Sequence, residues 1–222
     1  MNKKRSKPIT YYPIFLNLQD RRCVVIGGGK VALRKIKVLL DCEAKVTMIS
    51  PEPHPEIVRW SKKKVIRLIQ RDYRKEDLND AAVAFACTDV KETNRRVAED
   101  SKKLRVPVNV TDDPGLSEFI IPSFFRRGDL TIAVSTAGVS PALAKKIRKN
   151  LEKSLGKEYA SLVSLIGEVR SALKRRGCSV DREDWQKVLE LHSLMRFVKE
   201  GRTKKAKTFL LDQLKLHSKG RR

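Results

Sequence analysis

Short apolar runs alternate with amphipathic stretches over the first half of this 222-residue chain. Such alternation is typical of a parallel sheet whose strands are joined by crossover helices. Five apolar runs predict strands, at residues 23–27, 45–50, 65–70, 81–88 and 106–110. Two stretches between them, 31–42 and 93–104, carry apolar residues at helical spacing. The expected fold class is α/β, with a doubly wound parallel sheet.

The pattern changes after Asp113. Two β-prone runs on either side of residues 126–129 predict an antiparallel hairpin instead of a further strand–helix unit. Ser140 followed by Pro141 predicts the start of a helix, because serine is a good N-cap and proline fits the first helical position. That helix has an apolar residue at every fourth position: Leu143, Ile147, Leu151 and Leu155.

The rest of the sequence, from Tyr159 onward, predicts helices that are interrupted near Gly177 and Gly201. These changes of pattern divide the chain into three expected parts. They are a sheet domain at 1–113, a hairpin-and-helix region at 114–155 and a helical domain with a basic tail at 156–222.

Composition adds a strong positive charge, since 49 lysines and arginines oppose 26 acidic residues for a formal net charge of +23. Such a charge favours an anionic partner, whether nucleic acid, a membrane surface or a polyanionic small molecule. Much of the excess lies at the two ends, where runs of this kind are usually solvated tails. These residues are Lys3, Lys4, Arg5, Lys7, Arg202, Lys204, Lys205, Lys207, Lys215, Lys219, Arg221 and Arg222.

Several classes of protein fit this sequence poorly. No apolar run is long enough to span a bilayer, and no apolar signal core follows the basic N-terminus, so we expect a cytoplasmic protein with no membrane partner. The aromatic content of 6% and the lack of a known motif argue against nucleic acid as a partner. The histidines form no ligand-spaced pair, so no metal site is expected. Four widely separated cysteines predict reduced thiols: Cys23, Cys42, Cys87 and Cys178.

A glycine cluster joins the first strand to the first helix, in the order Gly27-Gly28-Gly29-Lys30-Val31-Ala32. The pattern G-x-G-x-x-A in this place is typical of a Rossmann-type dinucleotide-binding domain. Gly27 would allow the tight turn, Gly29 would let the backbone approach a pyrophosphate, and Ala32 would permit close helix packing. The pyrophosphate would bind at the helix N-terminus. The alternative is a glycine turn beside an empty crevice.

Two further strand ends offer candidate cofactor contacts. The acidic residue that usually binds the ribose hydroxyls corresponds here to Glu52, which lies beyond the strand, so the sequence does not decide between NAD and NADP. Thr88 and Asp89 form a polar turn after another strand. They either face the cofactor or only begin a helix that Asp89 or Thr93 caps.

Asp112 and Asp113 follow the fifth predicted strand at the same sheet edge. A carboxylate there could remove a proton beside a nicotinamide ring. An exposed aspartate has a pKa of about 3.9 and is a poor base at neutral pH, so this role requires burial or a positioned hydrogen bond. Taken alone, Asp112-Asp113-Pro114-Gly115 is better explained as an ordinary turn.

Three segments together resemble the precorrin-2 dehydrogenases of siroheme biosynthesis. The sequence is similar to the stand-alone enzymes and to the N-terminal part of the bifunctional dehydrogenase/ferrochelatases, continuously over about residues 11–155. The segments are YYPIFLNLQDRRCVVIGGGKVALRKIKVLL, FACTDVKETNRRV and VPVNVTDDPGLSEFIIPSFFRRGDLTIAVSTAGVSPALAKKIR.

This resemblance implies an NAD-dependent oxidation of precorrin-2 to sirohydrochlorin, and some relatives also insert Fe²⁺ to give siroheme. It implies that Asp112 is the proton acceptor. Cofactor contacts would come from Lys30, Val31, Pro51 and Glu52. It also implies a homodimer that the hairpin and the helices after it build.

The resemblance further places one loop near the substrate, with Ser135, Thr136, Gly138, Ser140 and Pro141. Thr136 stands where some relatives have serine, which puts any role of that serine in question. Because the substrate carries acetate and propionate groups, nearby cations should help to bind it. The candidates are Arg126, Arg127, Lys145 and Lys146. The competing hypothesis is a non-catalytic basic module that senses a nucleotide or binds nucleic acid, with an affinity that falls steeply with salt.

Overall fold

The computed structural model describes residues 9–219 and, within the last helix, side chains only as far as residue 214. The chain forms two compact units, Met1–Ile121 and Pro122–Arg222. Several basic residues of the expected tails lie outside this description: Lys3, Lys4, Arg5, Lys7, Arg221 and Arg222, with the side chains of Lys215 and Lys219. The expected division at residues 113 and 155 stays a prediction.

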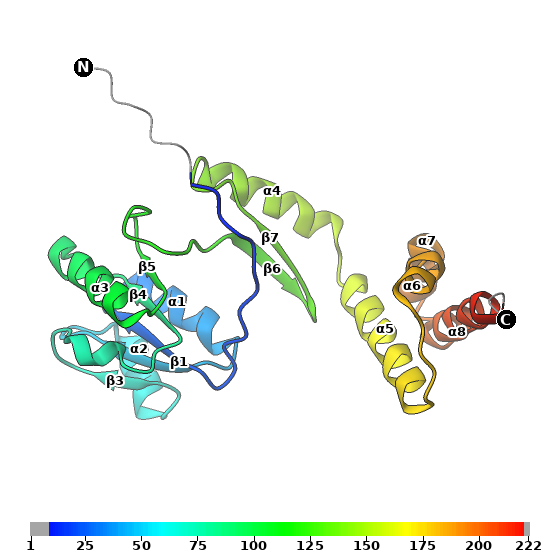
Figure 1. The fold of residues 1–222 in the computed structure, drawn as a ribbon, viewed down its shortest axis with the longest axis horizontal. Helices are drawn as coiled ribbons and strands as arrows, with labels where there is room; N and C mark the ends of the chain where they lie inside the picture. Colours follow the sequence, from blue (N-terminus) through cyan, green and yellow to red (C-terminus); the bar gives the residue numbers. More distant parts are fainter. Residues whose placement is uncertain (1–8, 220–222) are drawn as a thin grey trace, which may run out of the picture. The chain divides into compact units, whose positions relative to one another are not determined.

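The first unit contains a five-stranded parallel sheet in the order β3-β2-β1-β4-β5 (Figure 1). The strands are β1 (Arg22–Ile26), β2 (Lys45–Ile49), β3 (Arg67–Ile69), β4 (Val83–Ala86) and β5 (Val108–Val110). Three helices, α1 (Lys30–Leu40), α2 (Pro55–Lys62) and α3 (Lys91–Leu104), and the short 3-10 helix η1 (Lys75–Leu78) complete it. The α/β prediction is confirmed, and the strand order reverses between β1 and β4, where such sheets bind their ligands.

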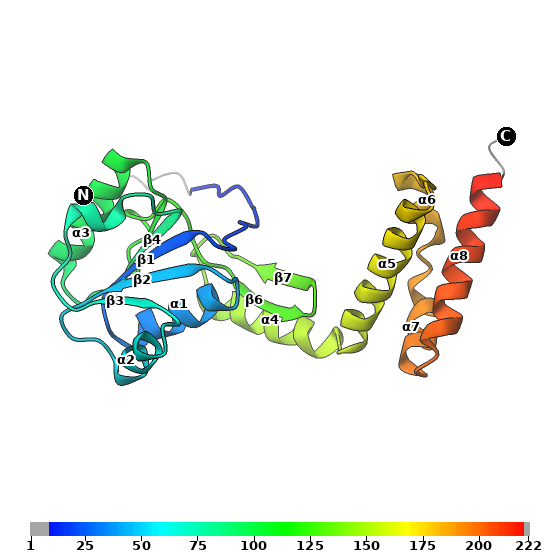
Figure 2. The same cartoon turned by 90° about the horizontal axis from the view of Figure 1, so that it is seen from below.

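Helices cover both faces of the sheet, so β1 is buried on each side. Cys23 and Val25 pack in one apolar cluster with residues of α1 and α2, whereas Val24 and Ile26 pack in another with residues of α3. Figure 2 shows α1 and α2 on one side of the sheet and α3 on the other. This burial explains the near-continuous apolar strands, because a strand covered on both faces has no polar side.

Two short elements were not predicted from the sequence, α2 and η1. Helix α2 buries only Ile57, so its apolar pattern is weak. The helix begins at Pro55, and His54 is its N-cap. His54 Nδ1 accepts the backbone N–H of Glu56 at 3.2 Å. His54 therefore has a structural role as the N-cap of α2.

The second unit begins with an antiparallel hairpin of β6 (Ser123–Arg127) and β7 (Leu130–Val134), which confirms that prediction. Helix α4 (Pro141–Ser154) follows, and Ser140 caps it by accepting the N–H of Leu143 at 3.3 Å. The remaining helices are α5 (Glu158–Arg175), α6 (Arg182–Val188), α7 (Leu191–Lys199) and α8 (Thr203–Lys219). Gly177 and Gly201 follow α5 and α7 with φ of 69° and 70°, so both predicted breaks are confirmed.

Helix α4 leaves the first two of its repeated apolar residues exposed and the other two half-buried. Leu143 is 50% exposed and Ile147 is 38% exposed, while Ala144 is the buried residue of this helix. By contrast, helices α5 to α8 share a core of their own that includes Leu165, Leu194 and Leu210. The apolar face of α4 therefore has to be explained by something other than the core of a single chain.

Asp77 in η1 holds the connection between β3 and β4. Its two carboxylate oxygens accept hydrogen bonds from the Arg71 guanidinium at 2.7 and 2.8 Å, and one also accepts the Arg74 backbone N–H at 2.8 Å. Burial raises the pKa of Asp77, but these hydrogen bonds outweigh it and hold the pKa below the usual range. The carboxylate therefore stabilises the fold above the unfolded-state pKa of about 3.9, and this stabilisation is lost as pH falls through the folded-state pKa.

We expect Asp77→Asn to lower the free energy of unfolding by about 1–3 kcal/mol at pH 7, because a buried hydrogen-bonded carboxylate is removed. The difference from the parent protein should shrink as the pH is lowered from 4 towards 2. Urea unfolding over this pH range measures it, with Asp72→Asn, an exposed neighbour, as the control. A constant difference at all pH values would contradict the assigned role.

Candidate active site

The glycine turn after β1 gives each of its three glycines a different role. Gly27 has φ of +111°, and a Cβ there would lie 2.5 Å from the carbonyl oxygen of Cys87. A Cβ on Gly28 would overlap the carbonyl oxygen of Glu52. A Cβ on Gly29 would meet no atom within 4 Å. The first two glycines are therefore required by the protein, and the third borders open space.

Helix α1 presents an uncapped N-terminus at this open space. Gly29 is its N-cap and provides no side chain, and the first turn contains no acidic residue. The first N–H groups of a helix have no partner within the helix, and they carry partial positive charge. The N–H groups of Lys30 and Val31 can therefore bind an anion such as a pyrophosphate. Ala32 is fully buried against the sheet, as its place in the pattern predicts.

The loop after β2 is attached directly to the glycine turn. The His54 N–H donates to the Gly28 carbonyl at 2.9 Å, and the Glu52 N–H donates to Ser50 Oγ at 3.2 Å. The Pro51 and Glu52 side chains are exposed. Gly28 was not among the predicted site residues, because the motif leaves its position unspecified; the contact that excludes a side chain there comes from a residue 24 positions later.

The turn after β4 is held by a residue that the sequence interpretation missed. Asn94 Oδ1 accepts the Thr88 N–H at 3.2 Å and the Thr88 hydroxyl at 2.9 Å, and Asn94 Nδ2 donates to the Thr88 carbonyl at 2.8 Å. The expected cap by Asp89 or Thr93 is wrong, since Val90 is the N-cap of α3 and no side chain caps it. Asn94, one turn into the helix, holds this turn instead.

The turn after β5 separates the two adjacent aspartates. Asp113 Oδ1 accepts the backbone N–H groups of Gly115 at 3.0 Å and Leu116 at 3.2 Å, so the turn interpretation applies to Asp113. The Asp112 side chain is exposed and forms no hydrogen bond or ion pair with the part of the chain that the structure describes. Its φ of +60° lies in the left-handed region, which is uncommon for residues other than glycine. The turn therefore uses the Asp113 carboxylate and leaves that of Asp112 facing solvent.

A group of polar residues lies beside this strand end. Lys35 Nζ of α1 donates to Asn109 Oδ1 of β5 at 2.8 Å and lies 5.1 Å from the centre of the Phe85 ring. Burial lowers the pKa of Lys35. The Thr111 hydroxyl donates to Cys87 Sγ at 3.4 Å, and burial raises the pKa of that thiol. Neither Lys35 nor Asn109 was predicted, because an interior lysine on a basic helix has no distinctive sequence signal.

The loop between β7 and α4 contains four of the predicted substrate residues. Ser135 Oγ accepts the Ala137 N–H and Thr136 Oγ1 accepts the Ser140 N–H, both at 3.1 Å. Ala137 and Gly138 have φ of 50° and 84°. The loop is therefore shaped by its own side chains, and Thr136 can accept this hydrogen bond just as a serine would.

The predicted cations of the second unit differ in their surroundings. Arg127 lies 3.7 Å from the Glu152 carboxylate, and its guanidinium lies 5.6 Å from the Phe125 ring, so it helps to hold the hairpin against α4. Arg126 is exposed, with its guanidinium 5.7 Å from the Phe124 ring. Lys145 and Lys146 are exposed on α4. Arg126 and the two lysines are thus more exposed to solvent than Arg127.

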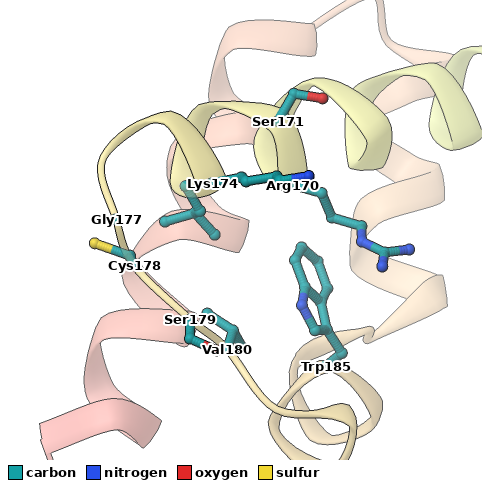
Figure 3. A pocket seen from close by; sticks show the side chains of 9 residues that line it. Arg170, Ser171, Lys174, Gly177, Cys178, Ser179, Val180 and Trp185 are labelled. Atoms are coloured by element: carbon teal, nitrogen blue, oxygen red, sulfur yellow. The ribbon is translucent and has the colours of Figure 1, made fainter.

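A separate hollow of about 440 Å³ lies within the helical part of the second unit, at the turn between α5 and α6 (Figure 3). Arg170, Lys174, Cys178 and Trp185 are among its lining residues. The Arg170 guanidinium lies 5.9 Å from the Trp185 ring, an interaction that stabilises this corner. No carboxylate or imidazole lines the hollow, so we place the candidate catalytic site at the sheet edge of the first unit.

The thiols, the possible metal ligands and the lengths of the helices bear on the kind of site. All four cysteines are free thiols, as predicted. Within residues 9–219, no three histidine, cysteine, aspartate or glutamate side chains gather as they would around a metal ion. A membrane-crossing helix is also not found among the described residues, since none is both long and apolar enough.

Comparison with known proteins agrees with this geometry. A family model described as putative NAD(P)-binding matches residues 14–123, and one described as sirohaem biosynthesis protein central matches residues 127–154. The siroheme synthase of Nitrosospira multiformis is 36% identical over 212 residues, which cover 93% of this chain and 45% of that protein. The siroheme synthase of Methylobacillus flagellatus is 38% identical over 164 residues, which cover 74% of this chain and 35% of that protein.

A solved structure extends the likeness to three dimensions. The structure described as SirC, precorrin-2 dehydrogenase, has a TM-score of 0.66 and 25% sequence identity, and the match covers 92% of this chain and 99% of that one. This chain spans less than half of the length of the curated siroheme synthases that it matches. The nicotinamide-cofactor fold of the first unit is thereby supported by sequence and by structure.

Proposed function

Since this chain belongs to the siroheme synthase family, we propose that it oxidises precorrin-2 to sirohydrochlorin with NAD as the hydride acceptor. The observation that carries this proposal is the placement of Asp112. An exposed carboxylate in a left-handed backbone conformation follows β5, at the same sheet edge as a glycine turn with open space for a pyrophosphate.

The residues of the first unit fit a dinucleotide. The α1 N-terminus at Lys30 and Val31 would hold the pyrophosphate, because it has free N–H groups and no competing side-chain cap. Pro51 and Glu52 would lie against the adenosine ribose. A carboxylate at Glu52 accepts ribose hydroxyls and repels a 2′-phosphate, which favours NAD over NADP. Thr88 and Asp89, after β4, would complete the cofactor side of the site.

In the reaction the substrate loses two electrons and two hydrogens. When bound, the nicotinamide ring accepts one hydrogen with both electrons as a hydride. The Asp112 carboxylate accepts the other hydrogen as a proton, while the electron pair of that bond enters the new double bond of the macrocycle. Bound substrate would cover Asp112, exclude water and strengthen it as a base. After the product leaves, the exposed position of Asp112 lets the proton pass to solvent.

Substrate binding would use the charge of the second unit. We propose that Ser135, Thr136, Gly138 and Ser140 bind the macrocycle or its side chains. Carboxylate side chains of the substrate would pair with Arg126, with help from Arg127, Lys145 and Lys146. These cations explain part of the large positive charge of the chain.

Anaerobic incubation of the protein with precorrin-2 and NAD tests the proposal, with the absorbance of NADH and of sirohydrochlorin followed together. We expect both to rise in equal amounts, and more slowly when NADP replaces NAD. NAD binding without turnover would favour the nucleotide-sensing alternative. Binding to nucleic acid, with an affinity that falls steeply with salt, would favour a basic binding module.

Insertion of Fe²⁺ into sirohydrochlorin is a second activity for the same residue. The metal can enter only when the pyrrole nitrogens lose protons, and the Asp112 carboxylate has no protein partner among the described residues, so it can accept them. Adding Fe²⁺ after the oxidation has finished tests this, with siroheme formation compared with the spontaneous rate. Fe²⁺ is here a substrate of the reaction.

We also propose a homodimer that the hairpin and α4 build, because the apolar residues of α4 are exposed in the single chain. Leu143→Glu should shift the protein from dimer to monomer, since a charge would have to be buried in the interface. Sedimentation velocity measures this, with Lys149→Glu on an exposed position of the same helix as the control. A parent protein that sediments as a monomer at high concentration would contradict the proposal.

A further inference from the structure

Lys35 of α1 directs its ammonium group to β5, the strand that precedes Asp112. Its Nζ donates to Asn109 Oδ1 at 2.8 Å and lies over the Phe85 ring. The side chain is half-buried, and no carboxylate lies within ion-pair distance of it among the described residues. A desolvated cation without an acidic partner costs stability, so a purely structural role would be served better by an uncharged residue.

The bond to Asn109 connects three segments. Asn109, at the centre of β5 and 8% exposed, accepts from Lys35 with its oxygen and donates to the Phe119 carbonyl with its nitrogen, at 3.0 Å. Phe119 in turn packs edge-on against Phe85, with ring centres 5.7 Å apart. The Asn109 side chain is therefore held at both ends, three residues before Asp112.

Titratable groups lie near Lys35 on each element that faces it. Arg34 lies on the same helix, Cys87 follows β4, and Asp112 follows β5. Burial lowers the pKa of Lys35, and Arg34 lowers it further, while Cys87 and Asp112 act in the opposite direction. The negative charge of Asp112 thus favours the charged form of Lys35.

From this geometry we propose that Lys35 is a positioning residue of the site, which holds the end of β5 in place through Asn109 and provides the positive charge that acts on Asp112. The coupling is weak while Asp112 faces water. It strengthens when substrate covers the site, because charges interact more strongly where water is excluded. The proposal rests on the proposed function, since it assigns Lys35 to the base of that reaction.

The first test needs no turnover. The titration of the Lys35 ammonium group is followed by NMR in the parent protein, in Asp112→Asn and in Asp113→Asn. We expect a lower titration midpoint in Asp112→Asn, because an opposite charge is lost. Asp113→Asn removes the same charge from the adjacent residue and should cause a smaller change. Equal midpoints in all three proteins would overturn the coupling.

The second test uses turnover. Lys35→Met should lower kcat about tenfold near pH 6 and move the acidic limb of the kcat profile to higher pH, with KM for NAD within about twofold of the parent. Lys35→Arg should return the acidic limb of the kcat profile to its position in the parent protein. Lys37→Met is the matched control, because Lys37 lies on the same helix over an aromatic ring, that of Trp60, but pairs with Glu56 at 3.1 Å.

The two proposals fail in different ways. If Asp112→Asn keeps full turnover, the proposed base is wrong, whatever the titration of Lys35 shows. If Asp112→Asn is inactive but Lys35→Met keeps the parent pH profile, the base assignment stands and the role of Lys35 is refuted. If Lys35→Met is poorly folded by circular dichroism, the Lys35→Arg profile and the NMR titration decide the question.

Discussion

Asp112→Asn is expected to abolish oxidation of precorrin-2, with kcat lower by about 10²–10⁴-fold, while the Kd for NAD stays within about twofold of the parent value. The substitution removes the only proposed proton acceptor but keeps the size of the side chain. It also keeps the backbone, because asparagine tolerates the left-handed conformation that Asp112 adopts at φ of +60°. Alanine at this position would add backbone strain to the loss of the base.

Stopped-flow measurement of NADH formation and calorimetric titration with NAD separate the two effects. Asp113→Asn is the matched control, since an asparagine oxygen still accepts the N–H groups of Gly115 and Leu116 and preserves the turn. It should keep most of the parental rate. Full turnover by Asp112→Asn, or equal losses in the two variants, would show that Asp112 is not the base.

Gly29→Ala is expected to leave a folded protein that binds NAD at least about tenfold more weakly. A Cβ on Gly29 meets no protein atom within 4 Å, so the fold accepts it with little change in stability. The methyl group instead fills the space at the α1 N-terminus where the pyrophosphate would lie. Calorimetric titration with NAD and thermal unfolding of the same sample measure both quantities.

Gly27→Ala should show the opposite behaviour. Its φ of +111° and the contact of a new Cβ with the Cys87 carbonyl predict a loss of about 3 kcal/mol or more of folding stability. Gly167→Ala is the control, because Gly167 lies within α5 and has free space around it, so alanine should keep or raise stability and leave NAD affinity unchanged. Parental NAD affinity in Gly29→Ala would refute the assigned cofactor site.

Much of the fold follows from local sequence patterns. The five strands, the helix after the glycines and the hairpin were predicted because apolar periodicity and turn residues are properties of neighbouring positions. Helix α2 was missed because it buries a single residue, Ile57, and so leaves almost no periodic signal. The sequence correctly predicts that α4 has apolar residues on one face, but Leu143 and Ile147 on that face are exposed. The reason is that periodicity shows which residues share a helix face and does not show what packs against that face.

The candidate site was likewise predicted only in part from the sequence. The glycine pattern identified the turn, and adjacent acids drew attention to the end of β5, because both are short and contiguous. The local pattern did not distinguish Asp112 from Asp113, and only the family resemblance selected Asp112. In the structure, Asp113 accepts the N–H groups of its own turn and Asp112 does not. The sequence also could not show that Asn94 holds Thr88 or that Glu52 excludes a side chain at Gly28.

By itself, the sequence determined the α/β class, the strand and hairpin segments, the dinucleotide pattern and the family likeness. Tertiary structure alone decided which residues meet at the carboxyl edge of the sheet. Lys35 comes from α1, Asn109 from the centre of β5, and Cys87 and Asp112 from the turns after β4 and β5. Only the pairing of β4 with β5 and the packing of α1 bring them together. The physical reason is that strand order and helix packing depend on contacts between residues far apart in the chain, which no local pattern encodes.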